Sequence, residues 1–222
     1  MPLPDRAAVL AAAATLGLAL SDDQADRLLA YLALLQRWNA TYNLTAIRDP
    51  DAMWLQHGLD CMAAVPAVGT LSNDGRRLRI LDVGSGGGLP GVVWALLLPQ
   101  ADVVCVDAVG KKAAFIRQAA GALRLPNLQA RHARVEDLSE APFDLVASRA
   151  FASLADFTRL TRRLLSPGGR WLAMKGKPPA DELAALDPQE LMFHVEPLAV
   201  PGLAAERCLV WLQPATVDSP KP

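Results

Sequence analysis

The pattern of apolar and polar positions divides the chain into two parts. Up to about residue 70, apolar side chains such as Leu28 and Leu32 recur at helical spacing, and Ser21 followed by Gln24 is typical of a capped helix start. From residue 78 onward, short apolar runs alternate with helical segments. We expect strands at 78–83, 102–107, 128–132, 143–148 and 170–175, helices between them, and a final hairpin made of 192–195 and 207–212.

Strands that alternate with helices are typical of a mostly parallel sheet with helices on both faces. The pattern therefore predicts an α/β, Rossmann-like fold with seven strands and an N-terminal helical extension. We expect a helical cap at 1–70, a ligand-binding domain at 71–214 and a frayed tail at 215–222. The Gly- and Ser-containing stretch 69–75 is the best candidate linker between the first two.

The turn after the first expected strand carries the clearest chemistry. It reads Asp-x-Gly-x-Gly-x-Gly, beginning at Asp82 and including Gly84 and Gly86. Glycines at a strand-to-helix turn let the backbone approach a ligand closely, and the N–H groups of the following helix favour negative charge. An acid inside the strand can fix the loop and attract the cationic methionyl end of S-adenosylmethionine. We therefore predict that Asp82, Gly84 and Gly86 bind this cofactor.

Two later strand ends extend the same expected site. Asp107 ends the second strand, 21 residues beyond Gly86, where a carboxylate can accept hydrogen bonds from both ribose hydroxyls of an adenosine ligand. Residues 134–137 follow the third strand, at a position where we expect adenine recognition. The carboxyl ends of these strands meet at one edge of a parallel sheet, so the pattern predicts an adenosine-binding edge.

Two other functions compete for this turn. Gly86, Gly88 and Gly91 also fit the dinucleotide fingerprint of a nicotinamide-dependent oxidoreductase. A short-chain dehydrogenase needs a lysine four residues after a tyrosine, but leucine and alanine stand four residues after Tyr31 and Tyr42. A non-catalytic RNA-binding module with a Rossmann-like fold is the second alternative, and the intact set of acids and glycines argues against it.

The residues after the fourth strand bear on the methyl acceptor. Methylation of an exocyclic amine usually shows Asn/Asp-Pro-Pro-aromatic here, whereas 148–151 reads Ser-Arg-Ala-Phe. Methylation of a pyrimidine C5 needs a thiolate in a Pro-Cys setting, which none of the three cysteines has. An atom with a free lone pair, such as guanine N7, needs neither group. In-line placement then supplies most of the catalysis, of order ~7–11 kcal/mol at best.

Composition and charge narrow the setting. The 222 residues are 52% hydrophobic and 20% charged, with a formal net charge of −1, so any RNA contact needs a local basic face. Three cysteines without CxxC spacing predict neither a disulfide framework nor a zinc site, and we expect no metal. No apolar run approaches the ~20 residues of a membrane span. We expect a monomeric cytoplasmic protein that does not bind membranes.

Taken together, these features resemble a known family. The chain is similar to the RsmG/GidB family, bacterial 16S ribosomal RNA guanine-N7 methyltransferases once called glucose-inhibited division protein B, at residues 42–47, His57, 82–91, 148–150 and 174–176. The resemblance runs from about residue 21 to 212. It implies a class I methyltransferase fold, S-adenosyl-L-methionine as cofactor, and a guanine in a decoding-region loop of 16S rRNA, in a small ribosomal subunit or assembly intermediate, as acceptor.

The resemblance also implies roles for particular residues. Its cofactor contacts correspond to Gly84, Leu89, Val135, Glu136 and Arg149, with Asp107 at the ribose. Two positions depart from the family pattern, because Gln56 and Cys61 stand where many members have arginine and serine. These departures concern the helix that contains His57 and leave the cofactor residues unchanged.

Residues outside the cofactor turn are candidates for substrate binding and catalysis. Arg149 and Lys175 end strands at the ligand edge, and we predict that both bind RNA and act in catalysis. Asn43 and His57 lie in the expected helical cap, and we predict that they help to present the RNA. Further candidates for a basic face are Arg48, Arg76, Arg77, Lys111, Lys112, Arg134 and Lys177.

Overall fold

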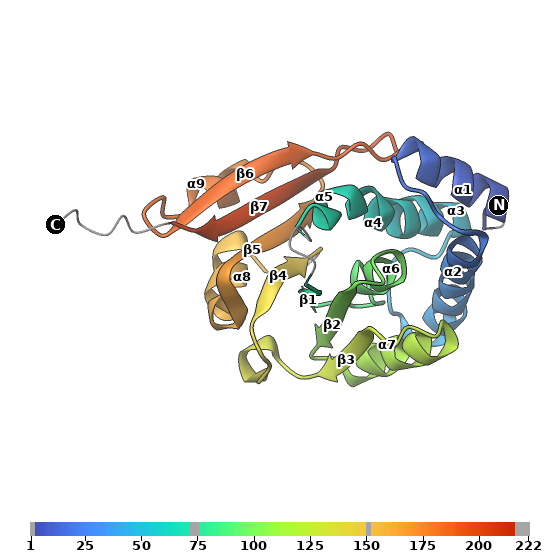
Figure 1. The fold of residues 1–222 in the computed structure, drawn as a ribbon, viewed down its shortest axis with the longest axis horizontal. Coiled ribbons are helices and arrows are strands. Elements are labelled where there is room, and N and C mark those ends of the chain that lie inside the picture. The colour runs from blue at the N-terminus through green and yellow to red at the C-terminus, as the bar shows by residue number, and fades with distance from the viewer. Residues whose placement is uncertain (1–2, 72–75, 150–151, 216–222) are drawn as a thin grey trace.

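The computed structural model describes residues 3–71, 76–149 and 152–215. They form a seven-stranded sheet in the order β3-β2-β1-β4-β5-β7-β6 (Figure 1). Strands β1 to β5 are parallel, and β7 pairs antiparallel with both β5 and β6. The strands are β1 Leu78–Val83, β2 Ala101–Asp107, β3 Leu128–His132, β4 Phe143–Ser148, β5 Leu165–Lys175, β6 Leu191–Pro197 and β7 Cys208–Pro214.

The helices follow the predicted order, and Ser21 and Gln24 form the expected capping box. A π-helical turn, Trp54–Leu59, interrupts the helical stretch that contains His57. Short 3-10 turns lie at Val135–Asp137 and Arg162–Leu164. The α-helices are α1 Arg6–Thr15, α2 Asp22–Tyr42, α3 Pro50–Met53, α4 Asp60–Ala63, α5 Val65–Gly69, α6 Gly91–Leu97, α7 Gly110–Ala122, α8 Leu154–Thr161 and α9 Ala180–Ala184.

The expected α/β sheet is confirmed, and the largest difference from the expected strand bounds lies at the fifth strand. We expected this strand to begin at residue 170, but α8 ends at Thr161 and β5 already begins at Leu165. Phe143 pairs with Leu165 and Leu145 with Arg170, so the strand bulges between these pairs. The Pro-Gly-Gly sequence inside the bulge has the composition of a turn, which is why the sequence pattern hides the strand.

The sheet separates two hydrophobic cores because successive side chains on a strand point to opposite faces. Ile80 and Val103 contribute to one cluster, whereas their neighbours Leu81 and Val104 contribute to the other. The first cluster includes side chains of α6 and α7, and the second includes side chains of α8. Figure 1 shows α6 and α7 on one side of the sheet and α8 on the other.

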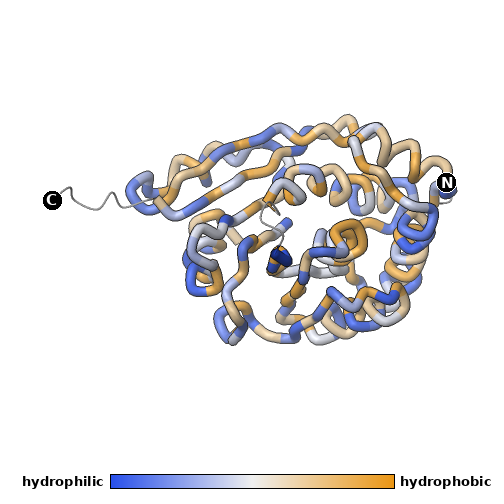
Figure 2. Tube along the Cα trace, in the orientation of Figure 1, coloured by the Kyte–Doolittle hydropathy of each residue, from blue (hydrophilic) through white to orange (hydrophobic). Residues whose placement is uncertain are grey.

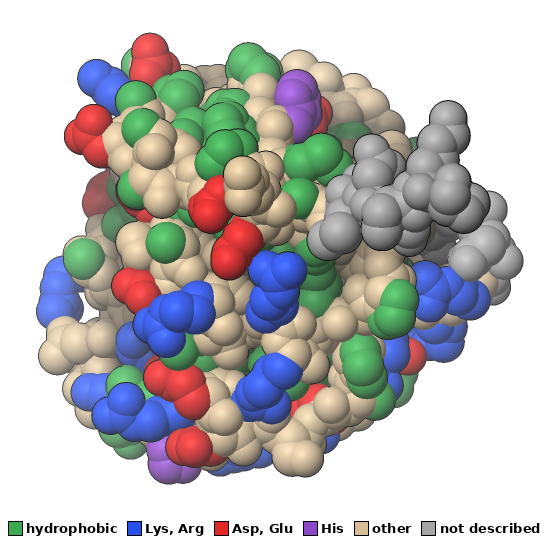
Figure 3. Space-filling model, turned by 90° about the vertical axis from the view of Figure 1, so that its left-hand side faces the viewer, with side chains coloured by type: hydrophobic (Ala, Val, Ile, Leu, Met, Phe, Trp, Pro, Cys, Tyr) green, Lys and Arg blue, Asp and Glu red, His purple; other side chains and the backbone are tan. Residues whose placement is uncertain are grey.

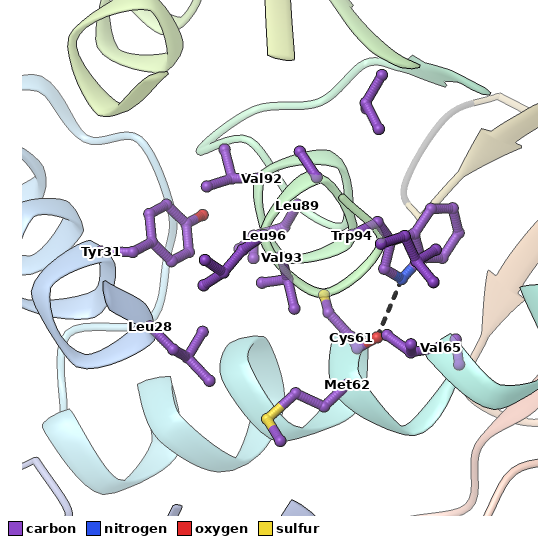
Figure 4. Packing of buried hydrophobic residues seen from close by; sticks show 14 of the residues in the cluster. Leu28, Tyr31, Cys61, Met62, Val65, Leu89, Val92, Val93, Trp94 and Leu96 are labelled. Atoms are coloured by element: carbon purple, nitrogen blue, oxygen red, sulfur yellow. Dashed lines mark hydrogen bonds between the residues drawn. The ribbon is translucent and has the colours of Figure 1, made fainter. Parts of the chain in front are cut away.

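The N-terminal helices pack against α6. Tyr31 of α2 and Cys61 of α4 lie on two sides of this helix, and Trp94 Nε1 donates to the Cys61 carbonyl at 3.0 Å (Figure 4). Helix α6 is hydrophobic over its length (Figure 2), as expected for a helix enclosed on all sides. The cap and the sheet therefore share one core. The expected border between residues 70 and 71 stays a prediction, and residues 72–75 of the linker and 216–222 of the tail lie outside the described residues.

No helix within the described ranges is both long enough and apolar enough to cross a bilayer. The same part of the chain contains no cluster of three or more His, Cys, Asp or Glu side chains suited to a metal ion.

Candidate functional site

The glycine turn joins β1 to α6 at the carboxyl edge of the sheet. Gly84 and Gly86 adopt φ values of 67° and 56°, in the left-handed region that glycine adopts without strain. The Gly84 N–H donates to the Val106 carbonyl at 2.9 Å, and the Gly88 N–H donates to the Ser85 carbonyl at 2.8 Å. These main-chain bonds hold the turn against β2 and leave Gly84 at the surface.

Asp82 lies beneath this turn and is fully buried. Its Oδ2 accepts a hydrogen bond from the Gly91 N–H at 2.9 Å, which ties β1 to the start of α6. Its Oδ1 has no hydrogen-bond partner among the described residues. Burial raises the pKa of the Asp82 carboxyl to about 6, against the opposing effect of the Gly91 hydrogen bond. In this structure Asp82 fixes the shape of the turn, and its carboxyl is buried rather than exposed.

Asp107 stands at the end of β2, beside the turn. Its Oδ2 accepts from the Gly86 N–H at 2.9 Å, and its Oδ1 accepts from the Val109 N–H at 2.8 Å. The Lys112 ammonium lies 3.8 Å away. A carboxylate offers about four acceptor positions, so capacity for ribose hydroxyls remains. Asp107 thus links the glycine turn to the second strand at the point where we expect the ribose.

A cavity of about 280 Å³ opens beside these residues. Three other predicted cofactor residues differ in exposure. Val135 is largely buried, Glu136 is exposed, and Leu89 is buried below the turn. Backbone carbonyls of the 3-10 turn accept from Arg163, at 2.9 Å for Val135 and 2.6 Å for Glu136. The cavity is lined by Val83, Gly84, Val106, Asp107, Ala108, Ala133, Arg134, Val135 and Glu136.

The acceptor groups and the apolar surface of this cavity fit an adenosyl ligand. Asp107 and Glu136 supply carboxylate acceptors for hydroxyl and amine groups, and Val135 supplies apolar surface. Gly84 lets the ligand approach the backbone closely. Arg163 was not foreseen from the sequence, because it lies 27 residues after Glu136 and acts through backbone carbonyls.

A second cavity, of about 300 Å³, lies at the ends of β4 and β5. It brings together three of the predicted substrate residues, His57, Arg149 and Lys175. Arg149 does not extend freely into it, because its Nη1 donates to the Gln56 carbonyl at 2.7 Å. We call this the acceptor cavity. Its lining residues are Ile47, Gln56, His57, Asp60, Arg149, Met174, Lys175, Gly176, Leu198, Arg207 and Cys208.

Asp60 is the centre of the charge network in the acceptor cavity. It is 3% exposed, and its two oxygens face two arginines that come from distant parts of the chain. Arg207 Nε donates to Oδ1 at 3.0 Å, and Arg149 Nη1 lies 3.7 Å from Oδ2. Burial raises the pKa of the Asp60 carboxyl, and both arginines oppose that shift. Neither Asp60 nor Arg207 was predicted, since no local pattern connects residues so far apart.

His57 is buried and contacts the segment between α2 and α3. Its Nδ1 is 3.0 Å from the Gln56 carbonyl, which fixes the proton on that nitrogen, so Nε2 accepts from the Thr45 hydroxyl at 2.7 Å. Burial first, and the Arg149 charge second, lower the pKa of His57 to about 4. His57 is therefore neutral at pH 7, and it adds no positive charge to the acceptor cavity.

The other two predicted substrate residues differ in exposure. Lys175 lines the acceptor cavity, and its Nζ donates to both carboxylate oxygens of Glu182, at 2.9 and 3.0 Å. Asn43 lies at the exposed end of α2, in the left-handed conformation with φ 50°. Its Oδ1 accepts from Arg48 Nη2 at 2.6 Å. Asn43 is outside the cavity lining, and its RNA role stays a prediction.

Helix α2 and the segment after it connect the two cavities. The Tyr31 hydroxyl donates to the Gly87 carbonyl at 2.6 Å, so the cap supports the glycine turn directly. The Leu44 carbonyl lies close to Gly86. A Cβ at Gly86 would be 3.9 Å from the Leu44 oxygen, which is an ordinary van der Waals contact. Ile47 lines the acceptor cavity. Residues 44–47 therefore run from the glycine turn to the acceptor cavity.

Basic side chains do not all gather at this edge. Arg76 and Arg77, two candidates for the basic face, precede β1 at the opposite edge and pair with Asp144 at 3.0 Å and Asp102 at 2.8 Å. Figure 3 views the side of the molecule that carries α8 and α9 in Figure 1. Basic side chains are more frequent in its lower half, with acidic ones among them. Any RNA attraction is therefore local.

A larger cavity, of about 540 Å³, lies elsewhere, between α5 and the β6–β7 hairpin. Phe193 and Trp211 are among its lining residues. Size alone makes it the more prominent hollow, but it has neither the glycine turn nor the strand-end acids. The two smaller cavities lie where ligands bind in open α/β sheets, at the carboxyl ends of the strands. We therefore assign the functional site to that edge.

Comparison with known proteins decides the family. A model of the GidB family, rRNA small subunit methyltransferase G, matches residues 24–210. The chain belongs to this family. Ribosomal RNA small subunit methyltransferase G of Leptothrix cholodnii is 59% identical over 216 residues, covering 97% of this chain and 99% of its own. The protein of the same name from Bordetella avium is 52% identical over 199 residues, covering 90% and 89%.

Solved structures agree with the fold of this GidB-family chain. TrmN of Thermus thermophilus superimposes with a TM-score of 0.52 at 26% identity, covering 66% of this chain and 47% of its own. A predicted O-methyltransferase from Agrobacterium tumefaciens gives 0.53 at 22% identity, covering 70% and 81%. The expected family, the class I methyltransferase fold and the enzyme class with S-adenosylmethionine as cofactor are confirmed. The oxidoreductase and the non-catalytic alternatives are thereby set aside.

Proposed function

We propose that this chain transfers a methyl group from S-adenosylmethionine to N7 of a guanine in a decoding-region loop of 16S ribosomal RNA. The observation that carries the proposal is the pair of cavities at the ends of neighbouring strands. One lies beyond β1 and β2 and has carboxylate acceptors and apolar surface suited to an adenosyl ligand. The other lies beyond β4 and β5 and has room for a nucleobase. Membership of the rRNA small subunit methyltransferase G family supports an rRNA acceptor.

The chemistry of N7 suits the second cavity. S-adenosylmethionine, when bound, supplies an electrophilic methyl group. Guanine N7 carries a lone pair and no proton, so no general base is required. As the new N–C bond forms, the sulfur–methyl bond breaks, so the positive charge passes from the sulfonium to the guanine ring and a neutral thioether is left. A neutral His57 and the Asp60 carboxylate keep the positive charge of the acceptor cavity low. The residues present thus need to orient the base and exclude water rather than move a proton.

The predicted residues divide between the two tasks. We assign Gly84, Gly86 and Asp107 to the adenosyl ligand, with Val135 and Glu136 at its adenine ring. Asp82 and Leu89 hold the turn from below.

Arg149 and Lys175 belong to the acceptor side in this proposal. Arg149 is anchored by the Gln56 carbonyl beside Asp60, and Lys175 is anchored by Glu182. We infer that both orient the guanine or an adjacent phosphate. His57 supports the wall of this cavity, and Asn43 meets RNA at its rim.

The setting follows from charge. With a net charge of −1, the protein attracts naked RNA weakly, and that attraction falls steeply with salt. We propose that a small ribosomal subunit or an assembly intermediate is the substrate, and that the protein acts as a monomer in the cytoplasm.

One experiment tests this function. Purified protein is incubated with methyl-labelled S-adenosylmethionine and small ribosomal subunits that lack the modification. The labelled RNA is digested to nucleosides to identify the product and, in parallel, to oligonucleotides to locate it. The expected product is 7-methylguanosine at a single position of the decoding region. Label on another atom or on ribosomal protein, or no incorporation by folded protein, contradicts the proposal. Replacing subunits by naked 16S rRNA in a parallel reaction identifies the preferred substrate, and we expect slower transfer.

A further inference from the structure

A row of three aromatic rings runs from α7 in the core to the end of α2 at the surface. Phe115 of α7 is fully buried, Trp38 is half-buried, and Tyr42 at the end of α2 is 41% exposed. The ring centroids of Phe115 and Trp38 are 5.4 Å apart, and those of Trp38 and Tyr42 are 5.0 Å apart. We call these three residues the aromatic row. Its outer ring is supported from below and keeps one side in solvent.

The position of Tyr42 in the chain connects this exposed ring to both cavities. It lies two residues before the segment 44–47, which passes the glycine turn at Leu44 and lines the acceptor cavity at Ile47. Asn43, the next residue, holds the Arg48 guanidinium at 2.6 Å. An exposed aromatic face beside an ordered cation is the combination that single-stranded nucleic acids use, with the base on the ring and the phosphate near the charge.

We propose that Tyr42 is a stacking platform for a nucleobase of the rRNA strand that flanks the target guanine. The proposal rests on the proposed function and names the contact by which the cap presents RNA to the acceptor cavity. A guanine that enters a cavity must leave the stack of its own strand, and this exposes the face of a neighbouring base. Tyr42 offers that neighbour a new partner. Trp38 and Phe115 hold the platform in place, so little ordering accompanies binding.

Substitutions at Tyr42 test the platform in methyl transfer to unmodified small subunits. Tyr42→Ala removes the ring, and a stack of this kind corresponds to roughly 5- to 150-fold in affinity. We expect KM for the subunit to rise at least about fivefold, with kcat and the Kd for S-adenosylmethionine within about twofold. Tyr42→Phe keeps the ring, and we expect wild-type kinetics. If Tyr42→Ala is unstable, Tyr42→Leu keeps the bulk and lacks only the aromatic face.

A matched control is available on the β6–β7 hairpin. Phe193 is 49% exposed on strand β6, and it lies away from the glycine turn and the acceptor cavity. Phe193→Ala removes an exposed aromatic of similar size, and we expect no change in KM for the subunit. An equal rise in KM for Phe193→Ala and Tyr42→Ala would show a general effect of surface apolar area and overturn the platform.

Cross-linking identifies the class of partner. Ultraviolet irradiation of the wild-type protein on small subunits is followed by mass spectrometry of the peptide that contains Tyr42. A nucleotide adduct supports the proposal, and an adduct with a ribosomal protein overturns it. Unchanged KM in Tyr42→Ala and Tyr42→Leu, with wild-type transfer intact, overturns the platform but leaves the function standing. Loss of transfer by the wild-type protein itself contradicts the function instead.

Discussion

The glycine turn and the acceptor cavity meet at one edge of the sheet, but they are built in opposite ways. Apart from the Tyr31 hydroxyl, the turn and its partners come from a short part of the chain, between Asp82 and Lys112, and they are held mainly by backbone N–H groups. The acceptor cavity draws residues from the cap, β4, β5 and the start of β7, and charged side chains hold it together.

This difference has a physical consequence. A turn whose N–H groups bond to backbone carbonyls and to the carboxylates of Asp82 and Asp107 has a fixed backbone shape, and it suits a ligand that is the same in every reaction. A cavity fixed by ion pairs depends on each of its members, because removing one partner leaves a buried charge uncompensated. Substitutions in the two regions should therefore fail in different ways.

The largest effect is expected in the acceptor cavity, at Asp60. Asp60→Ala leaves Arg149 and Arg207 facing each other without their shared carboxylate. We expect a loss of about 3 kcal/mol in the free energy of unfolding, at the lower end of the usual range because both arginines are partly exposed. Urea unfolding followed by circular dichroism measures it. Asp156→Ala removes an exposed carboxylate paired with Arg159, and it should cost much less than Asp60→Ala because water screens the exposed pair. Equal costs for the two variants would show that Asp60 holds nothing together.

The glycine turn is expected to fail through packing rather than charge. A Cβ at Gly91 would collide with Cys105 Sγ and would lie 2.9 Å from Asp82 Oδ2. We expect Gly91→Ala to cost about 1–3 kcal/mol of unfolding free energy and to weaken cofactor binding, because Asp82 loses its hold on the turn. Gly121→Ala is the matched control, since nothing lies within 4 Å of its Cβ. It should be neutral or stabilising by up to about 1 kcal/mol in helix α7. A silent Gly91→Ala would contradict the tight fit of the turn.

A smaller effect is expected from acid at His57. Its pKa is lowered to about 4 in the folded protein, so the unfolded chain binds the proton first as pH falls. The stability contributed by the neutral ring is complete above about pH 6.5 and is lost as pH falls toward 4. Between pH 7.5 and 5, His57 should account for a loss of about 2 kcal/mol.

The His57 effect is isolated by comparison with variants. Burial raises the pKa of Asp82 to about 6, so protonation of Asp82 stabilises the folded state over part of the same range and masks the slope of the wild-type protein. Urea unfolding of His57→Gln at both pH values should therefore show a smaller acid loss, or a gain, relative to wild type. His132→Gln, at an exposed histidine, should follow the wild-type curve. Identical curves for all three proteins would show that His57 is not buried as described.

Sequence reasoning succeeded where structure is local. The spacing of apolar runs placed β1, β3 and β4 at their observed bounds, and the acids at the ends of β1 and β2 followed from counting along the chain. The Asp60–Arg207 pair could not be found in this way, because 147 residues separate its members. The π-helical turn and the early start of β5 also escaped, since neither has a distinct apolar period.

The division between the two cavities is tested most directly at Arg149, with Asp107 as its counterpart. Lysine cannot reproduce the guanidinium that contacts the Gln56 carbonyl and Asp60. Cofactor titration by calorimetry and methyl transfer to small subunits are measured on Arg149→Lys and Asp107→Ala. Our account predicts that Arg149→Lys loses at least about tenfold in transfer, or about 1.4 kcal/mol, with cofactor Kd within about twofold, whereas Asp107→Ala weakens cofactor binding by about 1–3 kcal/mol. A weakened cofactor Kd in Arg149→Lys, with unchanged binding in Asp107→Ala, would contradict it.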